Sequence, residues 1–200
     1  MSDLREKLKR NRVWSIGIYV KDSGFSFRED LGSPDFVLDS KKLRSSGRHV
    51  HTKADPFLFP HDGIWYFFTT SSLGLELFYT DDIKEGHFIP HKQNPLTEDP
   101  RYNQCGGSPI RFNGNLYRIA QDCSGEYGRN ISILEINELS RVGYSEEVVI
   151  DDYFKLRDTW NARGGHHLSA VRFNEKIVIA VDGKQDDLWI NKVLSLVYRA

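Results

Sequence analysis

The sequence predicts a mainly β protein built from repeated hairpins, an architecture typical of β-propellers. Three segments share one pattern, in which a short extended run ends in Phe and is followed by a turn and a short apolar run. The anchoring residues Phe59, Phe112 and Phe173 lie 53 and 61 residues apart, and the last two stand in identical Arg-Phe-Asn triplets. A hairpin that recurs about every 50 residues is typical of propeller blades.

One short strand is expected before the first hairpin, and a second begins nearby. Residues 1–12 form a short charged N-terminal segment, whereas Val13-Trp-Ser-Ile-Gly-Ile-Tyr-Val alternates as a strand does. A further strand is expected from Gly24, and residues 28–48 have the composition of a polar surface connection. We expect the strand around Trp14 to complete the sheet of the last repeat and so to close a ring.

The hairpin repeats are expected near residues 54–83, 106–137 and 166–190, within a single domain over residues 13–200. The first hairpin is expected to have a four-residue turn after Phe59. The second and third are expected to have two-residue turns at Asn113-Gly114 and Asn174-Glu175. The sequence thus contains three clear repeats and an N-terminal partial one, which is no more than the four blades of the smallest known propellers.

The register of those turns predicts two cross-strand pairs. It sets Cys105 opposite Asp122, beside Cys123, and it sets His167 opposite Asp182. A disulfide between the cysteines is within geometric reach. The alternative is that both are reduced and pack as small hydrophobes, which is usual in a cytoplasmic protein.

The composition points to a folded, soluble protein. Lys and Arg number 27 and Asp and Glu 28, which gives a net charge of −1 and argues against nucleic acid as the partner. No apolar stretch approaches the roughly 20 residues that span a bilayer. The charged N-terminus lacks the apolar core of a signal peptide, so we expect a cytoplasmic protein without a membrane span.

Polar residues recur at equivalent places in the three repeats. The first strand of each propeller blade lines the central channel, so aligned positions would form a ring at its mouth. Counting back four and six residues from each anchoring Phe predicts a binding site that includes Asp55, Ser108, Ser169, Lys53 and His167. The alternative is that Asp55 and the two serines only cap turns through backbone hydrogen bonds.

The densest polar cluster is Arg163-Gly-Gly-His166-His167. An Asp182 carboxylate beside His167 would orient the imidazole and raise its pKa, although the same pair could serve a purely structural role. His49 and His51 would share one side of an extended segment, but no further ligand follows at a metal-site spacing, so no metal is expected. Nucleotide, serine-hydrolase and zinc-protease motifs are absent from the sequence, and no cofactor is expected.

Aromatic side chains beside such a ring would suit sugars, whose C–H faces pack on aromatic rings. Candidates for this role are Trp65, Tyr66, Tyr117 and Trp160. Trp65 and Tyr66 lie in an apolar strand, where a place in the core is the alternative.

Several strings resemble the N-terminal propeller domain of glucosamine inositolphosphorylceramide transferases. The resemblance covers most of residues 13–185, and its most specific part is Leu116-Tyr-Arg-Ile-Ala-Gln-Asp-Cys123. It also rests on Trp14-Ser-Ile-Gly-Ile-Tyr-Val, Ser23-Gly-Phe-Ser-Phe, Ala54-Asp-Pro-Phe-Leu-Phe, Trp65-Tyr-Phe-Phe, Leu77-Phe-Tyr-Thr-Asp-Asp, His91-Lys-Gln-Asn-Pro-Leu, Tyr127-Gly-Arg and His166-His-Leu-Ser. That domain is similar to the five-bladed propellers of glycoside hydrolase family 43.

The resemblance implies roles for two carboxylates. Asp55 lies in an Ala-Asp-Pro motif like that of the family's general base, and Asp122 would be a second carboxylate of the site. Glycosidase chemistry also needs a general acid, and no Glu stands in a comparable context. The chain also lacks about two of the family's blades. The resemblance therefore implies a five-bladed-propeller-like architecture with three clear blades and an N-terminal partial blade.

We therefore expect a domain that binds a carbohydrate or glycoconjugate and that is associated with sugar transfer or polysaccharide metabolism. Asp55, Asp122, Arg163, His166 and His167 are its expected centre. One alternative is an active glycosidase-like hydrolase with Asp55 as base. Another is a non-catalytic scaffold that pairs through an open sheet edge, as a homo-oligomer or with a companion catalytic domain.

Overall fold

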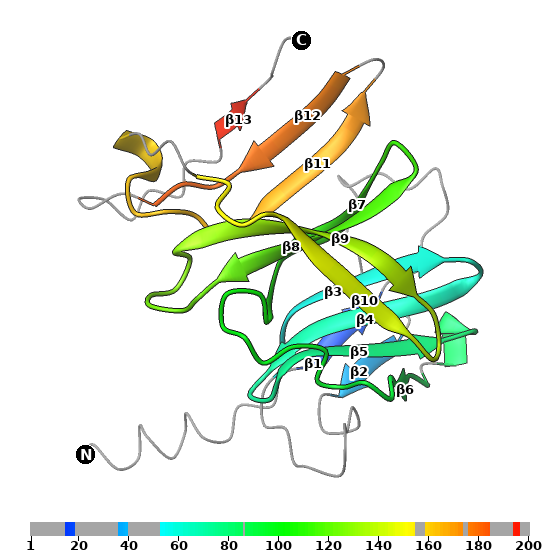
Figure 1. Cartoon of the computed structure of the whole chain (residues 1–200). Helices are drawn as coiled ribbons and strands as arrows, with labels where there is room; N and C mark the ends of the chain where they lie inside the picture. The colour runs from blue at the N-terminus through cyan, green and yellow to red at the C-terminus, as the bar shows by residue number, and fades with distance from the viewer. Residues whose placement is uncertain are drawn as a thin grey trace, which may run out of the picture.

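The protein is mainly β, as the sequence predicts. The computed structural model describes residues 15–18, 36–39, 53–85, 87–154, 159–173, 176–184 and 194–196. Its strands form four antiparallel sheets, each made of strands consecutive in the chain (Figure 1). The described residues include two 3₁₀ turns, η1 (Ile83–Glu85) and η2 (Thr159–Asn161), and no α-helix.

The first sheet pairs β1 (Ser15–Ile18) with β2 (Phe36–Asp39). The strand expected around Trp14 is thus confirmed, but its partner β2 lies in the stretch expected to be a surface connection. The N-terminal strand does not complete the last sheet, because it pairs with β2 instead, and no sheet closes into a ring within the described residues. The charged segment 1–12 and the strand expected from Gly24 lie outside the described residues.

The first hairpin opens a four-stranded sheet. It comprises β3 (Lys53–His61), β4 (Ile64–Ser71), β5 (Gly74–Thr80) and the short β6 (Ile89–Pro90), in that order. The turn is Asp62-Gly63 alone, so the expected four-residue turn is wrong. Both turn residues have positive φ, 49° and 76°, as a type I′ hairpin turn requires, and this lets β3 continue through Pro60.

The second hairpin opens another four-stranded sheet. Its strands are β7 (Gln104–Phe112), β8 (Asn115–Asp122), β9 (Asn130–Leu139) and β10 (Tyr144–Ile150), again in chain order. The predicted turn at Asn113-Gly114 is confirmed, with φ of 50° and 88°. The predicted pairing of Cys105 with Asp122 is wrong, because two register shifts along β7 set Cys105 opposite Ala120.

The third hairpin joins β11 (Leu168–Phe173) to β12 (Lys176–Val181), and β13 (Leu194–Leu196) adds a third strand. Its register is the one that the sequence predicts, with Phe173 opposite Lys176 and Leu168 opposite Val181. The regular register extends one step further, where the Asp182 amide donates to the His167 carbonyl at 3.3 Å.

The sheets pack face to face through their alternate side chains. Phe57, Phe68 and Leu77 of the β3–β6 sheet meet Cys105 and Leu116 of the β7–β10 sheet in one buried cluster. A second cluster joins the β7–β10 sheet to the β11–β13 sheet and is formed by Ile119, Ile131, Phe154, Leu168 and Val181. The first strands of the three sheets lie side by side, with β7 between β3 and β11 (Figure 1).

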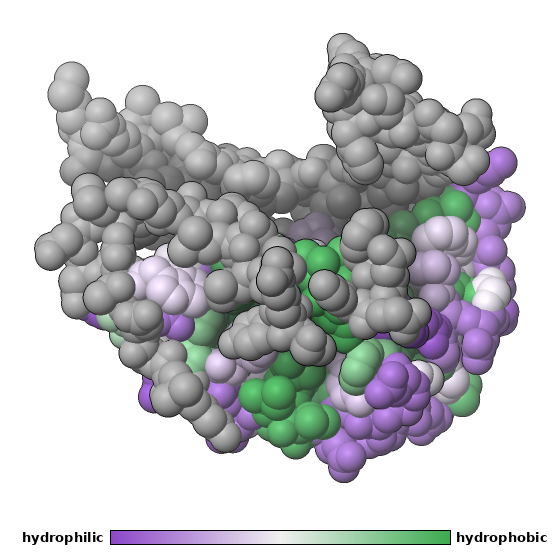
Figure 2. Space-filling view, turned by 90° about the horizontal axis from the view of Figure 1, so that it is seen from above, coloured by the Kyte–Doolittle hydropathy of each residue, from purple (hydrophilic) through white to green (hydrophobic). Residues whose placement is uncertain are grey.

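Part of the surface is apolar. From above, Figure 2 shows apolar residues gathered among hydrophilic ones. The most exposed large apolar residues among those described are Ile89, Phe112, Tyr127, Val142, Val148, Val149 and Val171. Scattered exposed apolar residues are ordinary in folded proteins, so this feature alone assigns no partner.

Candidate functional site

A cavity of about 190 Å³ opens where β3 and β7 meet the chain that leads into β11. It is lined by Asp55, Pro56, Phe57, Cys105, Gly107, Ser108, Gln121, His166 and His167. The structure therefore brings together four of the predicted site residues, from three separate repeats. They meet because the first strands of the three sheets are neighbours.

Two β-bulges shape this cavity. The β3–β4 register skips Asp55-Pro56, and the β7–β8 register skips Ser108-Pro109, at equivalent places in the two repeats. Proline has no N–H to donate to a strand ladder, so an Xaa-Pro pair inside a strand is accommodated by a bulge. Asp55 adopts φ 48°, an uncommon conformation for a non-glycine residue that is typical of functional sites.

The polar groups of the cavity have unused hydrogen-bonding capacity. Within the described part of the chain, the side chains of Asp55, Ser108 and His167 form no hydrogen bond or ion pair. Their expected alternative role as turn caps is therefore not seen for Asp55 or Ser108. A carboxylate, a hydroxyl and an imidazole thus line one small space with donors and acceptors available to a ligand.

Burial in the cavity raises the pKa of the Asp55 carboxyl above its usual value of 3.8, while the positive charges of His166 and His167 act in the opposite direction. The residue as a whole is exposed to solvent, but partial removal of water is still the largest effect on this pKa. A carboxylate without a protein partner is available to a ligand's hydroxyl or ammonium group.

Asp182 orients the histidine pair. Its Oδ1 accepts hydrogen bonds from the backbone amides of His166 at 3.0 Å and His167 at 2.7 Å, and its Oδ2 contacts His166 Nδ1. The predicted His–Asp pair exists, but the imidazole that it holds belongs to His166, whereas His167 contributes its backbone.

The same contacts shift two pKa values in opposite directions. The hydrogen bond to Asp182 raises the pKa of His166 above 6.5, although burial acts against it. Burial acts to raise the pKa of Asp182, but the hydrogen bonds from His166 and His167 hold it below its usual value. The pair therefore favours imidazolium and carboxylate together.

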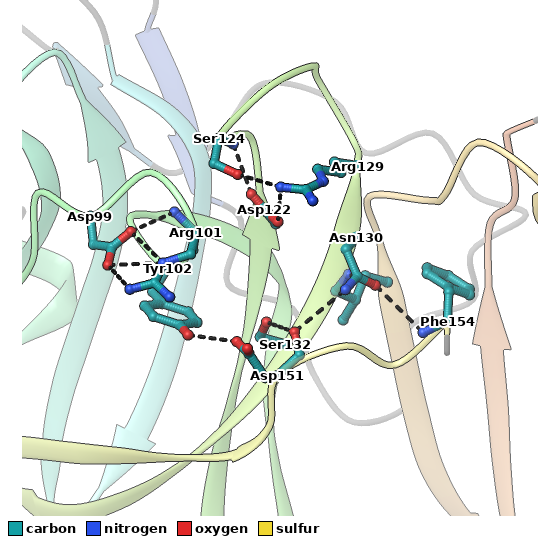
Figure 3. Close-up of polar contacts among 11 residues, drawn as sticks. Asp99, Arg101, Tyr102, Asp122, Ser124, Arg129, Asn130, Ser132, Asp151 and Phe154 are labelled. Atoms are coloured by element: carbon teal, nitrogen blue, oxygen red, sulfur yellow. Dashed lines mark hydrogen bonds and ion pairs between the residues drawn. The ribbon is translucent and has the colours of Figure 1, made fainter. Parts of the chain in front are cut away.

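Asp122 closes a loop and does not line the cavity. Figure 3 shows its carboxylate between Ser124 and Arg129, where it accepts from the Ser124 amide at 2.7 Å and lies 3.7 Å from the Arg129 guanidinium. Its backbone carbonyl also accepts from the Arg129 amide at 3.0 Å. These bonds tie together the two ends of residues 123–129, which we call the β8–β9 loop.

Other predicted site residues lie around the cavity or outside it. Arg163 donates to Glu126 of the β8–β9 loop at 3.0 Å. Ser169 is exposed on β11 and is not part of the lining, so the predicted ring of three equivalent side chains reduces to Asp55 and Ser108. Lys53 begins β3, but its side chain lies outside the described residues.

The aromatic residues expected beside a sugar site lie elsewhere. Tyr66 is buried in the core, Trp160 packs against Phe154 with ring centroids 6.2 Å apart, and Tyr117 accepts a hydrogen bond from Asn115. Tyr127 of the β8–β9 loop is instead the aromatic residue beside the cavity, with its ring 5.3 Å from that of His166.

Sequence reasoning also missed five lining residues, among them Gln121 and Phe57. Both lie inside strings quoted for the family resemblance, Leu-Tyr-Arg-Ile-Ala-Gln-Asp-Cys and Ala-Asp-Pro-Phe, so the resemblance was the signal that could have found them.

Both cysteines are free thiols. Burial raises the pKa of Cys105 to about 12, which keeps the thiol protonated and unreactive at the cavity wall. Cys123 accepts a hydrogen bond from the Gln121 side chain at 3.2 Å. The interpretation of two reduced, packed cysteines agrees with this geometry.

Among the described residues, no three His, Cys, Asp or Glu side chains gather as metal ligands would, and His49 and His51 lie outside those residues. No helix in the described ranges is long and apolar enough to cross a bilayer.

Comparison with known proteins agrees with the resemblance noted in the sequence. The family model described as glucosamine inositolphosphorylceramide transferase 1, N-terminal, matches residues 49–184. The chain is 33% identical over 129 residues to glucosamine inositolphosphorylceramide transferase 1 of Oryza sativa subsp. japonica. This alignment covers 58% of this chain and 17% of that protein. It is 29% identical over 143 residues to the Arabidopsis thaliana protein of the same name, covering 64% of this chain and 19% of that one.

No solved structure matches this chain. The chain spans about a fifth or less of these relatives' length. The region that the family model matches, residues 49–184, holds every lining residue of the cavity. Since the family model covers more than half of the chain, this protein belongs to the family of the N-terminal region of glucosamine inositolphosphorylceramide transferase 1.

Proposed function

We propose that this chain is a carbohydrate-binding domain associated with sugar transfer, and that the cavity at Asp55 holds the sugar part of a glycoconjugate. The observation that carries the proposal is the cavity itself, where the Asp55 carboxylate, the Ser108 hydroxyl and the His167 imidazole have no partners within the described residues. The relatives' printed name, a transferase that acts with glucosamine and inositolphosphorylceramide, supports a glycoconjugate as the ligand.

The cavity's size and chemistry support a single small ring. Its 190 Å³ is less than the roughly 300–1,000 Å³ of typical drug-sized ligand sites. Phe57 and Pro56 supply an apolar wall, and the polar groups around it can hydrogen-bond several hydroxyls at once. A polyhydroxylated ring with an apolar C–H face fits both features.

The arrangement of the strands supports a propeller-like scaffold for this site. β3, β7 and β11 each begin a sheet, and β7 lies between the other two, as the inner strands of neighbouring blades do. Ligand sites at the mouth of such an arrangement draw residues from several blades, as this cavity does.

Hydrolysis receives less support than binding. Glycoside hydrolases need a pair of carboxylates on either side of the scissile bond. Among the described residues that line the cavity, Asp55 alone is a carboxylate, since Asp122 closes the β8–β9 loop and Asp182 holds His166.

The binding function is tested by calorimetric titration of the full chain with glucosamine, glucose and myo-inositol. We expect saturable binding of at least one sugar without turnover, and at least a tenfold loss in Asp55→Asn, because hydrogen bonds to a charged partner contribute about 1.5–3 kcal/mol. Asp62→Asn is the matched control, since Asp62 has nearly the same φ, 49°, but lies in an exposed turn. Equal affinity in both variants, or release of sugar from a glycoside, would contradict the proposal.

A further inference from the structure

The β8–β9 loop places an exposed aromatic ring at the edge of the cavity. Tyr127 is 60% exposed, and its ring lies 5.3 Å from that of His166, tilted by 49°. His166 is itself a lining residue, so one part of the tyrosine ring contacts the cavity wall while the rest faces solvent. Exposure alone assigns no role to this ring, but its contact with a lining histidine places it within reach of a ligand in the cavity.

The loop that carries Tyr127 is anchored on both sides. Asp122 closes its base through the Ser124 and Arg129 amides. At its tip, the Glu126 carboxylate accepts from Arg163 at 3.0 Å and from Lys184 at 2.9 Å.

The same lysine fixes the backbone at the tyrosine itself. Lys184 Nζ donates to the Tyr127 carbonyl at 3.1 Å, so two cationic side chains from other segments, Arg163 and Lys184, hold the loop. The position of the ring is therefore set before a ligand arrives, which reduces the ordering entropy that binding must overcome.

Two glycines let the loop approach the histidine pair. A Cβ on Gly128 would lie 3.1 Å from His166 Cβ, and a Cβ on Gly164 would lie 2.1 Å from the Arg129 carbonyl oxygen. Both residues also have positive φ, 68° and 111°. The β8–β9 loop, which carries Tyr127, thus packs directly against the Arg163-Gly-Gly-His-His cluster.

The charges around the cavity disfavour an anionic ligand. The Asp182 carboxylate already pairs with His166, which offsets the charge of the imidazolium. Within the described lining, Asp55 is the carboxylate, and it has no ion pair of its own. Its charge reaches Tyr127, since burial first and then the Asp55 charge raise the pKa of the Tyr127 hydroxyl. A phosphate in this space would meet a like charge.

We propose that Tyr127 is the specificity-determining platform of the site, packing against the C–H face of a pyranose ring whose hydroxyl or amino groups bind Asp55. This inference rests on the proposed function and narrows it, because the bound part is then a neutral or amino sugar and not a phosphate group. Tyr127 acts through its ring face, and the loop anchored by Glu126 holds that face beside the cavity.

The test is a set of NMR titrations of the full chain with glucosamine, methyl glucoside and glucosamine 6-phosphate. We expect Tyr127→Ala to weaken binding of the preferred sugar about tenfold, the upper end of an aromatic contact's contribution, and Tyr127→Phe to keep most of the affinity. The matched control is Phe112→Ala, an exposed aromatic residue at a hairpin tip outside the cavity. The phosphorylated sugar should bind no more tightly than glucosamine.

The outcomes separate this inference from the proposed function. Wild-type affinity in Tyr127→Ala, together with a loss in Asp55→Asn, overturns the platform and leaves sugar binding standing. Tighter binding of glucosamine 6-phosphate overturns the selection against anions. Absence of any sugar binding by the wild-type chain overturns both proposals. Because Tyr127 is exposed, Tyr127→Ala should fold, and an unchanged circular dichroism spectrum checks this.

Discussion

The Arg118 guanidinium is fully buried and donates two hydrogen bonds to the Glu146 carboxylate, at 2.7 and 2.6 Å. The Tyr144 hydroxyl donates to the same carboxylate at 2.6 Å. Arg118 is the arginine of the Leu-Tyr-Arg-Ile-Ala-Gln-Asp-Cys string that carries the family resemblance. Three residues of that string therefore have different roles. Arg118 forms a structural ion pair, Gln121 lines the cavity, and Asp122 closes the β8–β9 loop.

Breaking this ion pair should destabilise the fold strongly. Glu146→Gln leaves the Arg118 charge buried without a counter-charge, so we expect the free energy of unfolding to fall by about 3–5 kcal/mol in urea denaturation. Glu147→Gln is the control, because Glu147 is the exposed neighbour on the same strand, β10. Equal stability of the two variants would show that Glu146 does not stabilise Arg118.

His166 should titrate above its usual pKa of 6.5, because Asp182 stabilises the imidazolium. Asp182→Asn removes that charge while burial still opposes protonation, so the imidazole midpoint should fall to 6.5 or lower in NMR pH titrations. A midpoint that does not move in the variant would show that Asp182 does not charge the ring.

The same shift predicts the pH dependence of stability. Because the pKa of His166 is raised in the folded state, its protonation stabilises the folded protein fully below pH 6.5. This contribution is lost as the pH rises through the folded-state pKa. Because the pKa of Asp182 is lowered in the folded state, its ionised carboxylate stabilises the folded protein above pH 3.8, and this contribution is lost as the pH falls through the folded-state pKa. The stability difference between wild type and Asp182→Asn should therefore be larger near pH 6 than at pH 8, and a difference independent of pH would contradict this account.

At the scale of elements, sequence alone predicted the hairpins well and their bulges poorly. The register of β11 and β12 is as expected because that hairpin is regular, whereas two bulges in β7 displaced Cys105 from Asp122 to Ala120. Ser108-Pro109 carried a signal for one of them, since prolines inside strands stand at sheet edges or at bulges. The other shift, at Gly106, has no proline, and Pro60 continues β3 without a bulge, so the register depends on tertiary contacts.

The choice between His166 and His167 has a similar cause. Register placed His167 opposite Asp182, and the backbone confirms that placement. The Asp182 carboxylate, however, contacts the imidazole of the adjacent residue, His166, and not that of its direct cross-strand partner. Pairing rules specify Cα positions, and the side-chain contacts depend on the surrounding loops.

The close approach of β7 to β11 depends on Gly107. A Cβ there would lie 2.1 Å from the Leu168 carbonyl oxygen, and its φ of 149° already disfavours a side chain. Gly107→Ala should therefore lower the free energy of unfolding by about 1–3 kcal/mol more than Gly114→Ala in urea denaturation. Gly114 also has positive φ, but it has open space around it, so the difference isolates the contact between strands. Equal losses would contradict a tight junction.

At the scale of the whole molecule, the described residues form cavities toward opposite ends of β3 and β7. One is the Asp55 cavity, and another, of about 290 Å³, is lined by His61, Arg111 and Glu135 near the hairpin turns. Arg111 already contacts the His61 ring nitrogen at 2.5 Å and lies over the Phe59 ring, so its cation is engaged. The Asp55 cavity differs in that it gathers residues from three repeats, with the Asp55, Ser108 and His167 side chains unpartnered within the described residues.

The sequence predicted the class of fold and four of the nine lining residues because hairpin spacing and turn chemistry are local signals. It did not predict Tyr127, whose place beside His166 depends on the docking of one loop on another. Similarly, the pairing of β1 with β2 depends on contacts between segments far apart in the chain. The proposed association with sugar transfer rests on the relatives' name, and the chain spans about a fifth of their length.

The most direct test of the central claim is amide chemical-shift mapping of the isotopically labelled full chain during titration with glucosamine. Our account predicts saturable shifts centred on Asp55, Ser108, Tyr127 and His166-His167, which vanish in Asp55→Asn and persist in Asp62→Asn. Shifts centred on Arg111 and Glu135, or none up to saturating sugar, would contradict the assignment of the Asp55 cavity as a carbohydrate site.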